Sequence, residues 1–100
     1  MRRILSNLTF IKKNGIGKFL ERQNVRIAFL RTMIDNYDDG RSKGYYCRAS
    51  ALLDPGTLKR SIDKATLQIR VDRIKQTDVK SRAKILRAIL DEQLSKAWTH

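Results

Sequence analysis

Apolar residues recur at helical spacing along almost the whole chain, and this period constrains the fold more than any other feature of the sequence. The clearest case is the last quarter, where apolar positions three or four residues apart alternate with charged ones. The apolar stripe is Val79, Ala83, Leu86, Leu90, Leu94 and Ala97, and the outward residues are Lys80, Lys84, Arg87 and Asp91. We therefore predict a helix that is capped by Thr77, with Asp78 in its first turn.

Three earlier segments show the same period. Residues 2–13 predict a short helix, and residues 18–37 predict the longest helix. The long helix should end where Gly40 can adopt a left-handed backbone. Residues 45–53 predict a third helix. The residues expected to face the core are Ile4, Leu5, Leu8 and Ile11 in the first segment, Phe19, Leu30, Met33, Ile34 and Tyr37 in the second, and Tyr45, Ala49, Leu52 and Leu53 in the third.

Residues 58–75 carry apolar stripes on two opposite sides. One stripe is Leu58, Ile62, Ala65 and Ile69, and the other is Leu67, Val71 and Ile74. Residues 66–72 also alternate as a strand would, but a single strand has nothing to pair with, so we favour a helix. Asp54 or Thr57 can serve as its N-cap, with Pro55 in the first turn. The second stripe suggests contact with another subunit, as in a homodimer formed through residues 58–75.

Together these segments predict an all-α single domain over residues 1–100, a small bundle of four to five helices. A chain of 100 residues can bury one core of modest size. The longest apolar runs have four residues, so no transmembrane segment is expected. We expect a cytoplasmic protein.

Residue types that carry catalytic or metal chemistry are scarce. Cys47 is the only cysteine, which excludes an intrachain disulfide and a zinc site built from several cysteines. The only histidine is His100, so the usual general base is missing from the interior of the sequence. We therefore expect no enzymatic activity, no metal and no cofactor.

The charge balance is the main indication of function. The chain has 22 Lys and Arg against 10 Asp and Glu, a formal net charge of +12. Such a surplus is typical of proteins that bind nucleic acid, where each cation that neutralises a phosphate releases a counterion. Residues 1–34 hold eight basic side chains and one acidic, and residues 55–76 hold six basic and two acidic. An acidic patch, Asp35, Asp38 and Asp39, separates these two basic regions.

The segment Gly15-Ile16-Gly17-Lys18 lies between two predicted helices and resembles the hairpin of helix-hairpin-helix DNA-binding modules. The resemblance implies that backbone N–H groups at a helix N-terminus hold a phosphate. Lys12, Lys13 and Lys18 would add positive charge there. Lys13 departs from the pattern, which usually has an apolar residue before the glycines. The plain alternative is a turn that needs glycine for its backbone freedom.

Residues 45–72 have the outline of a helix-turn-helix: a short helix, a tight turn with Gly56 and a basic second helix. The resemblance implies that Lys59, Arg60 and Lys64 face a DNA groove or its phosphates. Pro55 in the turn departs from the pattern. Two helices joined by a short turn also occur in any helical bundle.

Arg41-Ser42-Lys43-Gly44-Tyr45-Tyr46 places two cations beside two aromatic rings, a combination that can hold single-stranded nucleic acid. The alternative is that the tyrosines pack at the start of a helix, with their hydroxyls at the rim of the core.

These observations predict a small nucleic-acid-binding protein, a regulator or accessory factor, that contacts the phosphates of DNA or RNA. The expected contact residues are Lys12, Lys13, Lys18, Arg41, Lys43, Lys59, Arg60 and Lys64. The alternative is a helical protein-interaction module or homo-oligomer without catalytic activity. A membrane-surface role for residues 1–20 also remains open.

Overall fold

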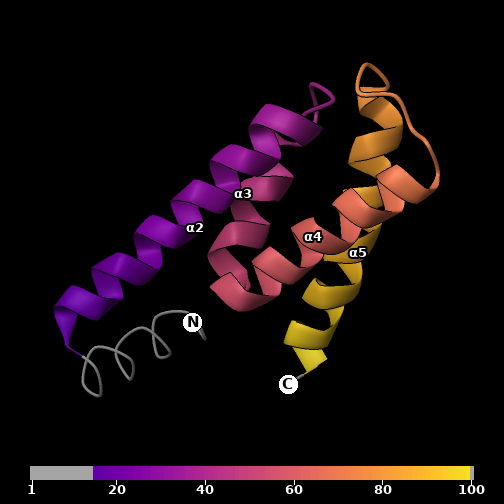
Figure 1. Ribbon diagram of the computed structural model, residues 1–100. Helices are drawn as coiled ribbons and strands as arrows, with labels where there is room; N and C mark the ends of the chain where they lie inside the picture. Colours follow the sequence, from indigo (N-terminus) through magenta and orange to yellow (C-terminus); the bar gives the residue numbers. More distant parts are fainter. Residues whose placement is uncertain (1–14, 100) are drawn as a thin grey trace.

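The computed structural model describes residues 15–99, without the side chains of Ile16, Phe19, Trp98 and Thr99. These residues form four α-helices and no strand, so the all-α prediction is confirmed. The helices are α2 (Ile16–Tyr37), α3 (Lys43–Leu52), α4 (Pro55–Val71) and α5 (Val79–Thr99) (Figure 1). The helix predicted over residues 2–13, which would be a fifth, lies outside the described residues.

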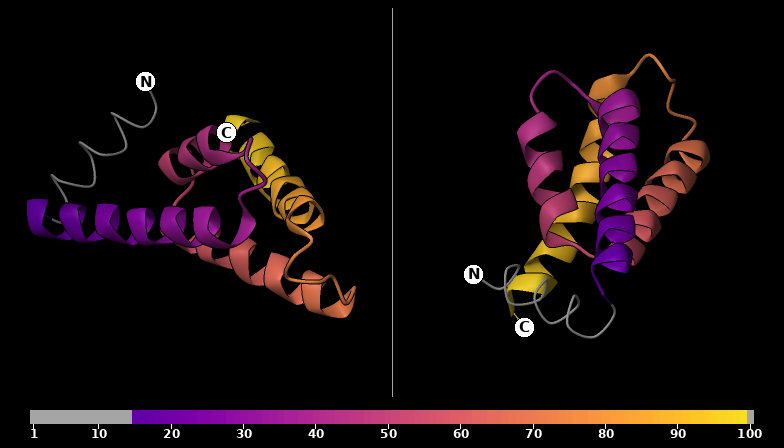
Figure 2. Two further views of the ribbon diagram at one scale, coloured as in Figure 1. Left: turned by 90° about the horizontal axis from the view of Figure 1, so that it is seen from above. Right: turned by 90° about the vertical axis from the view of Figure 1, so that its left-hand side faces the viewer.

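The four helices form a small bundle of two layers. Two further views show α2 and α4 on one side and α3 and α5 on the other (Figure 2). Each helix contacts the other three. The N-terminal half of α2 extends beyond the other helices, so residues near Ile16 lie far from the centre of the bundle (Figure 2).

The core lies where the four helices converge, and every helix contributes to it. The first of the two stripes predicted for α4 and most of the α5 stripe are confirmed, because their central residues are buried. The buried apolar residues are Met33 and Tyr37 from α2, Tyr46 and Ala49 from α3 with Leu53 behind it, Leu58, Ile62, Ala65 and Ile69 from α4, and Ala83, Leu86 and Leu90 from α5. Ala97, predicted to face inward, is exposed near the end of α5.

In α3 the predicted inward face is partly wrong. Leu52 is 44% exposed, and Tyr46, which the prediction left out, is fully buried. The buried positions Tyr46, Ala49 and Leu53 are spaced three and four residues apart, which is the helical repeat. Leu52 falls between these positions and therefore points outward.

Residues 66–71 are helical, as favoured, but α4 ends at Val71 and not at residue 75. The backbone N–H of Ile74 donates to the carbonyl of Ile69 at 3.0 Å, and that of Arg73 donates to the carbonyl of Arg70 at 3.2 Å. These two bonds form a Schellman motif, which closes a helix by placing one residue in the left-handed region. That residue is Arg73, with φ of 55°.

The N-terminal caps of α4 and α5 are both aspartates. Asp54 caps α4 by accepting a hydrogen bond from the N–H of Thr57 at 3.2 Å, as one of the two predicted alternatives required. The prediction of Thr77 as the cap of α5 is wrong. Asp78 precedes that helix, and its Oδ1 accepts from the N–H of Ser81 at 3.2 Å, so the carboxylate reaches the third helical residue.

Candidate nucleic-acid interface

Positive charge is in surplus within the described residues. Residues 15–99 contain 18 Lys and Arg and 10 Asp and Glu. The ion pairs among them join Lys43 to Asp38, Lys59 to Asp63 and Lys96 to Glu92, with N–O distances of 3.9, 2.8 and 3.3 Å. Most exposed cations of this part of the chain therefore face solvent without a carboxylate beside them.

The largest group of predicted contact residues lies on the solvent face of α4. Its core stripe occupies one side of the helix, so Lys59, Arg60 and Lys64 point outward, and all three are exposed. The Nη2 of Arg60 donates to the Oγ1 of Thr57 at 3.2 Å, which orients the guanidinium along the first turn. Arg60 and Lys64 lie one helical turn apart and form no ion pair with the described residues.

Arg70 belongs to the same helix and was absent from the predicted contact set. It is exposed and forms no ion pair among the described residues, and it lies about 9 Å along the axis from Lys64. The count of basic residues in 55–76 includes it, so the charge pattern alone could have added it to the set.

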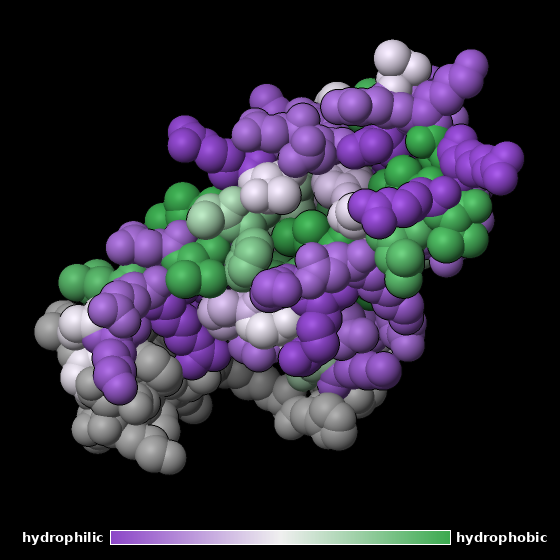
Figure 3. Space-filling model, viewed as in Figure 1, coloured by the Kyte–Doolittle hydropathy of each residue, from purple (hydrophilic) through white to green (hydrophobic). Residues whose placement is uncertain are grey.

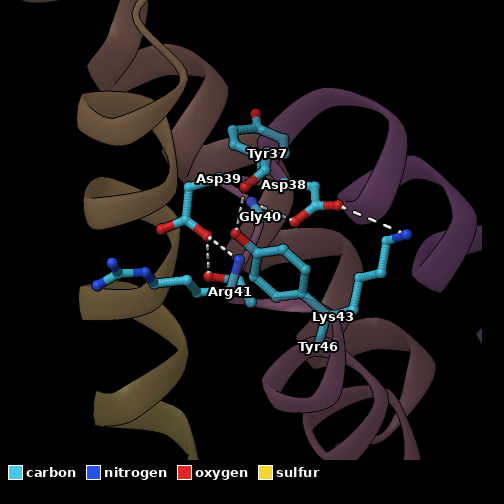
Figure 4. Close-up of polar contacts among 8 residues, drawn as sticks. Tyr37, Asp38, Asp39, Gly40, Arg41, Lys43 and Tyr46 are labelled. Atoms are coloured by element: carbon cyan, nitrogen blue, oxygen red, sulfur yellow. Dashed lines mark hydrogen bonds and ion pairs between the residues drawn. The ribbon is translucent and has the colours of Figure 1, made fainter.

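Arg41 and Lys43 lie in and after the loop between α2 and α3, where two aspartates organise the backbone (Figure 4). The Oδ1 of Asp38 accepts from the N–H of Gly40 at 2.8 Å, and the Oδ1 of Asp39 accepts from the N–H of Arg41 at 3.0 Å. Gly40 is left-handed, with φ of 87°, as predicted, although it lies beyond the last residue of α2.

The two aspartates of this loop compensate the two cations. Hydrogen bonds from the backbone of Arg41 and from the hydroxyl of Ser42 hold the pKa of the Asp39 carboxyl below its usual value, so it is ionised at neutral pH. Asp38 pairs with Lys43. The side chains of Arg41 and Lys43 also point away from each other (Figure 4). The loop therefore offers less net positive charge than α4.

Lys18 is separate from both groups. It is exposed in the first turn of α2, and about 28 Å of helix separates it from Tyr37, the residue before the loop. The predicted contact residues thus form three separate groups, at the start of α2, in the loop and on α4. Lys12 and Lys13 lie outside the described residues.

The tyrosines after the loop pack in the protein, which favours the second of the two predicted readings. Tyr46 is fully buried, and its hydroxyl donates to the carbonyl of Tyr37 at 2.7 Å. The guanidinium of Arg87 lies 4.9 Å from the centre of the Tyr45 ring, and the Tyr45 hydroxyl donates to the carboxylate of Asp91. The Tyr46 ring is therefore closed to a nucleic-acid base, and Arg87 covers one face of the Tyr45 ring.

The two motif resemblances are only partly matched. α3 and α4 are joined by two residues, Leu53 and Asp54, whereas a helix-turn-helix usually has a turn of about three or four. Gly56 lies inside the first turn of α4 and not between the helices. Of the two hairpin glycines, Gly15 is left-handed with φ of 87°, and Gly17 is already within α2.

An open groove of about 270 Å³ runs between α2, α4 and α5, on the side of α4 next to the core. Tyr37 and Thr66 meet in it through their hydroxyls, 3.0 Å apart, and Arg82 stacks 5.3 Å from the centre of the Tyr37 ring. No group of acidic, histidine or cysteine residues in the described chain could hold a metal ion. None of the helices described is long and apolar enough to cross a membrane.

Comparison with protein-family models, with curated proteins and with solved structures finds no significant match to this chain.

Proposed function

We propose that this protein binds nucleic acid through phosphate contacts made by the solvent face of α4. The observation that carries the proposal is the group of three exposed cations on α4, Arg60, Lys64 and Arg70, which form no ion pair with the described residues. Side chains of this kind can approach the phosphates of a polyanion without first breaking a salt bridge. Lys59 adds to this group of cations, although it is paired with Asp63.

The distribution of the carboxylates supports binding without catalysis. Asp38, Asp39, Asp54 and Asp78 accept backbone hydrogen bonds at helix ends or in the α2–α3 loop. Their roles are structural, and they lie at three separate places: the α2–α3 loop, the start of α4 and the start of α5. A mechanism based on two carboxylates would need a pair that converges on one site.

The interaction with nucleic acid would be electrostatic and largely independent of base sequence. A negatively charged backbone, either DNA or RNA, would lie along α4 and meet cations spaced over about 15 Å, the axial distance from Arg60 to Arg70. The formal net charge of +12 would also accelerate the encounter with a polyanion.

Fluorescence anisotropy of labelled double-stranded DNA, single-stranded DNA and RNA, titrated with the protein at several salt concentrations, tests this function. We expect binding at about 0.15 M salt, with a slope of log K against log salt of about −2.7 or steeper for duplex DNA, which corresponds to three phosphate contacts. Binding that appears only at low salt would contradict the proposal, because it would reflect general attraction by the net charge.

A further inference from the structure

The two halves of the solvent face of α4 differ in polarity. Its C-terminal half exposes two apolar side chains, Leu67 at 60% and Val71 at 66%. Both lie on the side of the helix opposite the core stripe, four residues and therefore about one turn apart. Hydrophobic residues gather on the surface over this end of α4, and further hydrophobic surface crosses the middle of the same view (Figure 3).

Arg60 and Lys64 continue the same line toward the N-terminus of α4. The four residues Arg60, Lys64, Leu67 and Val71, here called the α4 outer stripe, are spaced by four, three and four positions. This is the spacing of the seam residues in a coiled coil, so the stripe runs nearly straight along the helix. It spans about 16 Å, which matches three turns of another helix.

On each flank of the stripe, two polar side chains bind each other. On one flank the Nζ of Lys59 pairs with the Oδ2 of Asp63 at 2.8 Å. On the other flank the Nε2 of Gln68 donates to the Oδ2 of Asp72 at 2.9 Å. These contacts engage the carboxylates nearest to the stripe, so the stripe itself presents only positive charge and apolar surface.

A second copy of the chain fits this stripe poorly. A parallel pair of stripes would set Arg60 and Lys64 against the same cations of the partner, which is repulsive. An antiparallel pair over the full stripe would set each cation against Val71 or Leu67.

Nucleic acid and a membrane surface also match the stripe poorly. A phosphate backbone would leave the two apolar side chains unused. A membrane surface would favour cations along both edges of an apolar face, whereas here cations and apolar residues follow each other along the axis.

We propose that the α4 outer stripe docks an acidic amphipathic helix of another protein. Such a helix would place apolar side chains against Leu67 and Val71 and carboxylates against Arg60 and Lys64, as in helix-in-groove recognition. The contact is small, so the complex would be transient. The two cations fix the orientation of the bound helix, because the reversed helix would set carboxylates against apolar side chains.

The probe for this inference is a fluorescein-labelled designed helical peptide that carries two leucines and two glutamates at the spacing of the stripe. We expect an anisotropy titration to show binding in the micromolar range. Leu67→Ser combined with Val71→Ser should weaken it at least tenfold. Leu52→Ser, a change at a residue 44% exposed on α3, is the matched control and should leave the affinity unchanged.

Two controls separate this inference from nucleic-acid binding. Leu67→Ser with Val71→Ser removes no charge, so its affinity for duplex DNA should equal that of the unmodified protein. A peptide with lysines in place of the glutamates should not bind, because it would set cations against Arg60 and Lys64. If the lysine peptide bound equally well, or if the serine changes had no effect on peptide binding, the inference would be wrong.

Two further results would reassign the stripe. Sedimentation equilibrium that showed a dimer, lost on the serine changes, would assign it to a second copy of the chain. Failure to bind the peptide, with attachment to vesicles containing phosphatidylserine that the serine changes abolish, would assign it to a membrane surface. Either result would overturn docking of an acidic helix.

Discussion

At the residue scale, the hydroxyl of Tyr46 joins two helices. The side chain is fully buried, and its hydroxyl donates to the last carbonyl of α2, that of Tyr37, at 2.7 Å. The final carbonyls of a helix have no partner within the helix, so this bond satisfies a group that burial would otherwise penalise. Burial in turn raises the pKa of Tyr46 to about 12.

We predict that the free energy of unfolding falls between pH 10 and pH 12, in part because of Tyr46. Folding raises the pKa of this hydroxyl from 10.0 to about 12, so its stabilisation is complete below pH 10 and is lost as the pH rises through 12. Tyr46→Phe should make that fall shallower. It should also lower stability at neutral pH by about 1 kcal/mol, because the carbonyl of Tyr37 loses its donor. Urea unfolding at several pH values measures both effects, and an equally steep fall in the variant would contradict this account.

Arg73 has a left-handed backbone just after α4, and this conformation predicts an effect on stability. It holds φ of 55° at the end of α4, a conformation that costs a non-glycine residue about 1 kcal/mol. Arg73→Gly should therefore raise the free energy of unfolding, by up to about 1 kcal/mol. Arg73→Ala removes the same charge but keeps the strain, so it should bring no such gain. Thermal unfolding of the two variants side by side distinguishes strain from charge.

At the scale of elements, α4 has two faces with different roles. The inner face holds Leu58, Ile62, Ala65 and Ile69 against the other helices, and the outer face carries the cations and the exposed apolar pair. Of the two stripes seen in the sequence, the first is therefore buried in the core, and the second is exposed on the helix at Leu67 and Val71. The third residue of the second stripe, Ile74, lies beyond the helix and packs against the core.

The same substitution on the two faces of α4 should cause a large loss of stability on one face and almost none on the other. Leu58 is fully buried, so Leu58→Ala should lower the free energy of unfolding by about 3 kcal/mol. Leu67 is 60% exposed, so Leu67→Ala should change it by less than about 0.5 kcal/mol. Urea unfolding of both variants tests the orientation of the helix, and similar losses of stability would show that it is wrong.

The sequence was most informative where apolar residues repeat regularly. In α5 a single long stripe is interrupted by charges, and in α4 the stripe from Leu58 to Ile69 is longer than the opposite one, so one orientation of each helix buries the most apolar surface. In α3 two tyrosines and two leucines are each adjacent in sequence, and ten residues are too few to choose between Tyr45 and Tyr46. The choice depends on a tertiary contact, the bond from the Tyr46 hydroxyl to Tyr37, that periodicity does not contain.

The same limit applies to the candidate site. The sequence located the cations on α4, and the pair between Lys59 and Asp63 follows from their separation of four residues. It could not show that the α2–α3 loop would fold around its own aspartates, because that arrangement depends on the local backbone. The loop cations are thereby partly compensated, which leaves α4 as the stronger candidate.

At the scale of the whole molecule, the bundle holds four helices in contact and sets α4 along one side of a body of 45 × 27 × 23 Å. The cations predicted to bind nucleic acid do not converge into one patch. Those on α4 share a single helix, so the positions of their backbone atoms are set before any ligand binds. A preformed helix loses less backbone entropy on binding than a flexible segment would.

The most direct test of the central claim is the salt dependence of duplex DNA binding by Arg60→Gln/Lys64→Gln, compared with the unmodified protein. The matched control is Lys80→Gln/Lys84→Gln on α5, which removes the same charge from exposed residues at the same spacing. If α4 contacts the phosphates, the slope of log K against log salt should become shallower by about 1.8 in the first variant and change little in the control. Equal slopes in the two variants would contradict the claim, because they would show that net charge, and not the solvent face of α4, holds the nucleic acid.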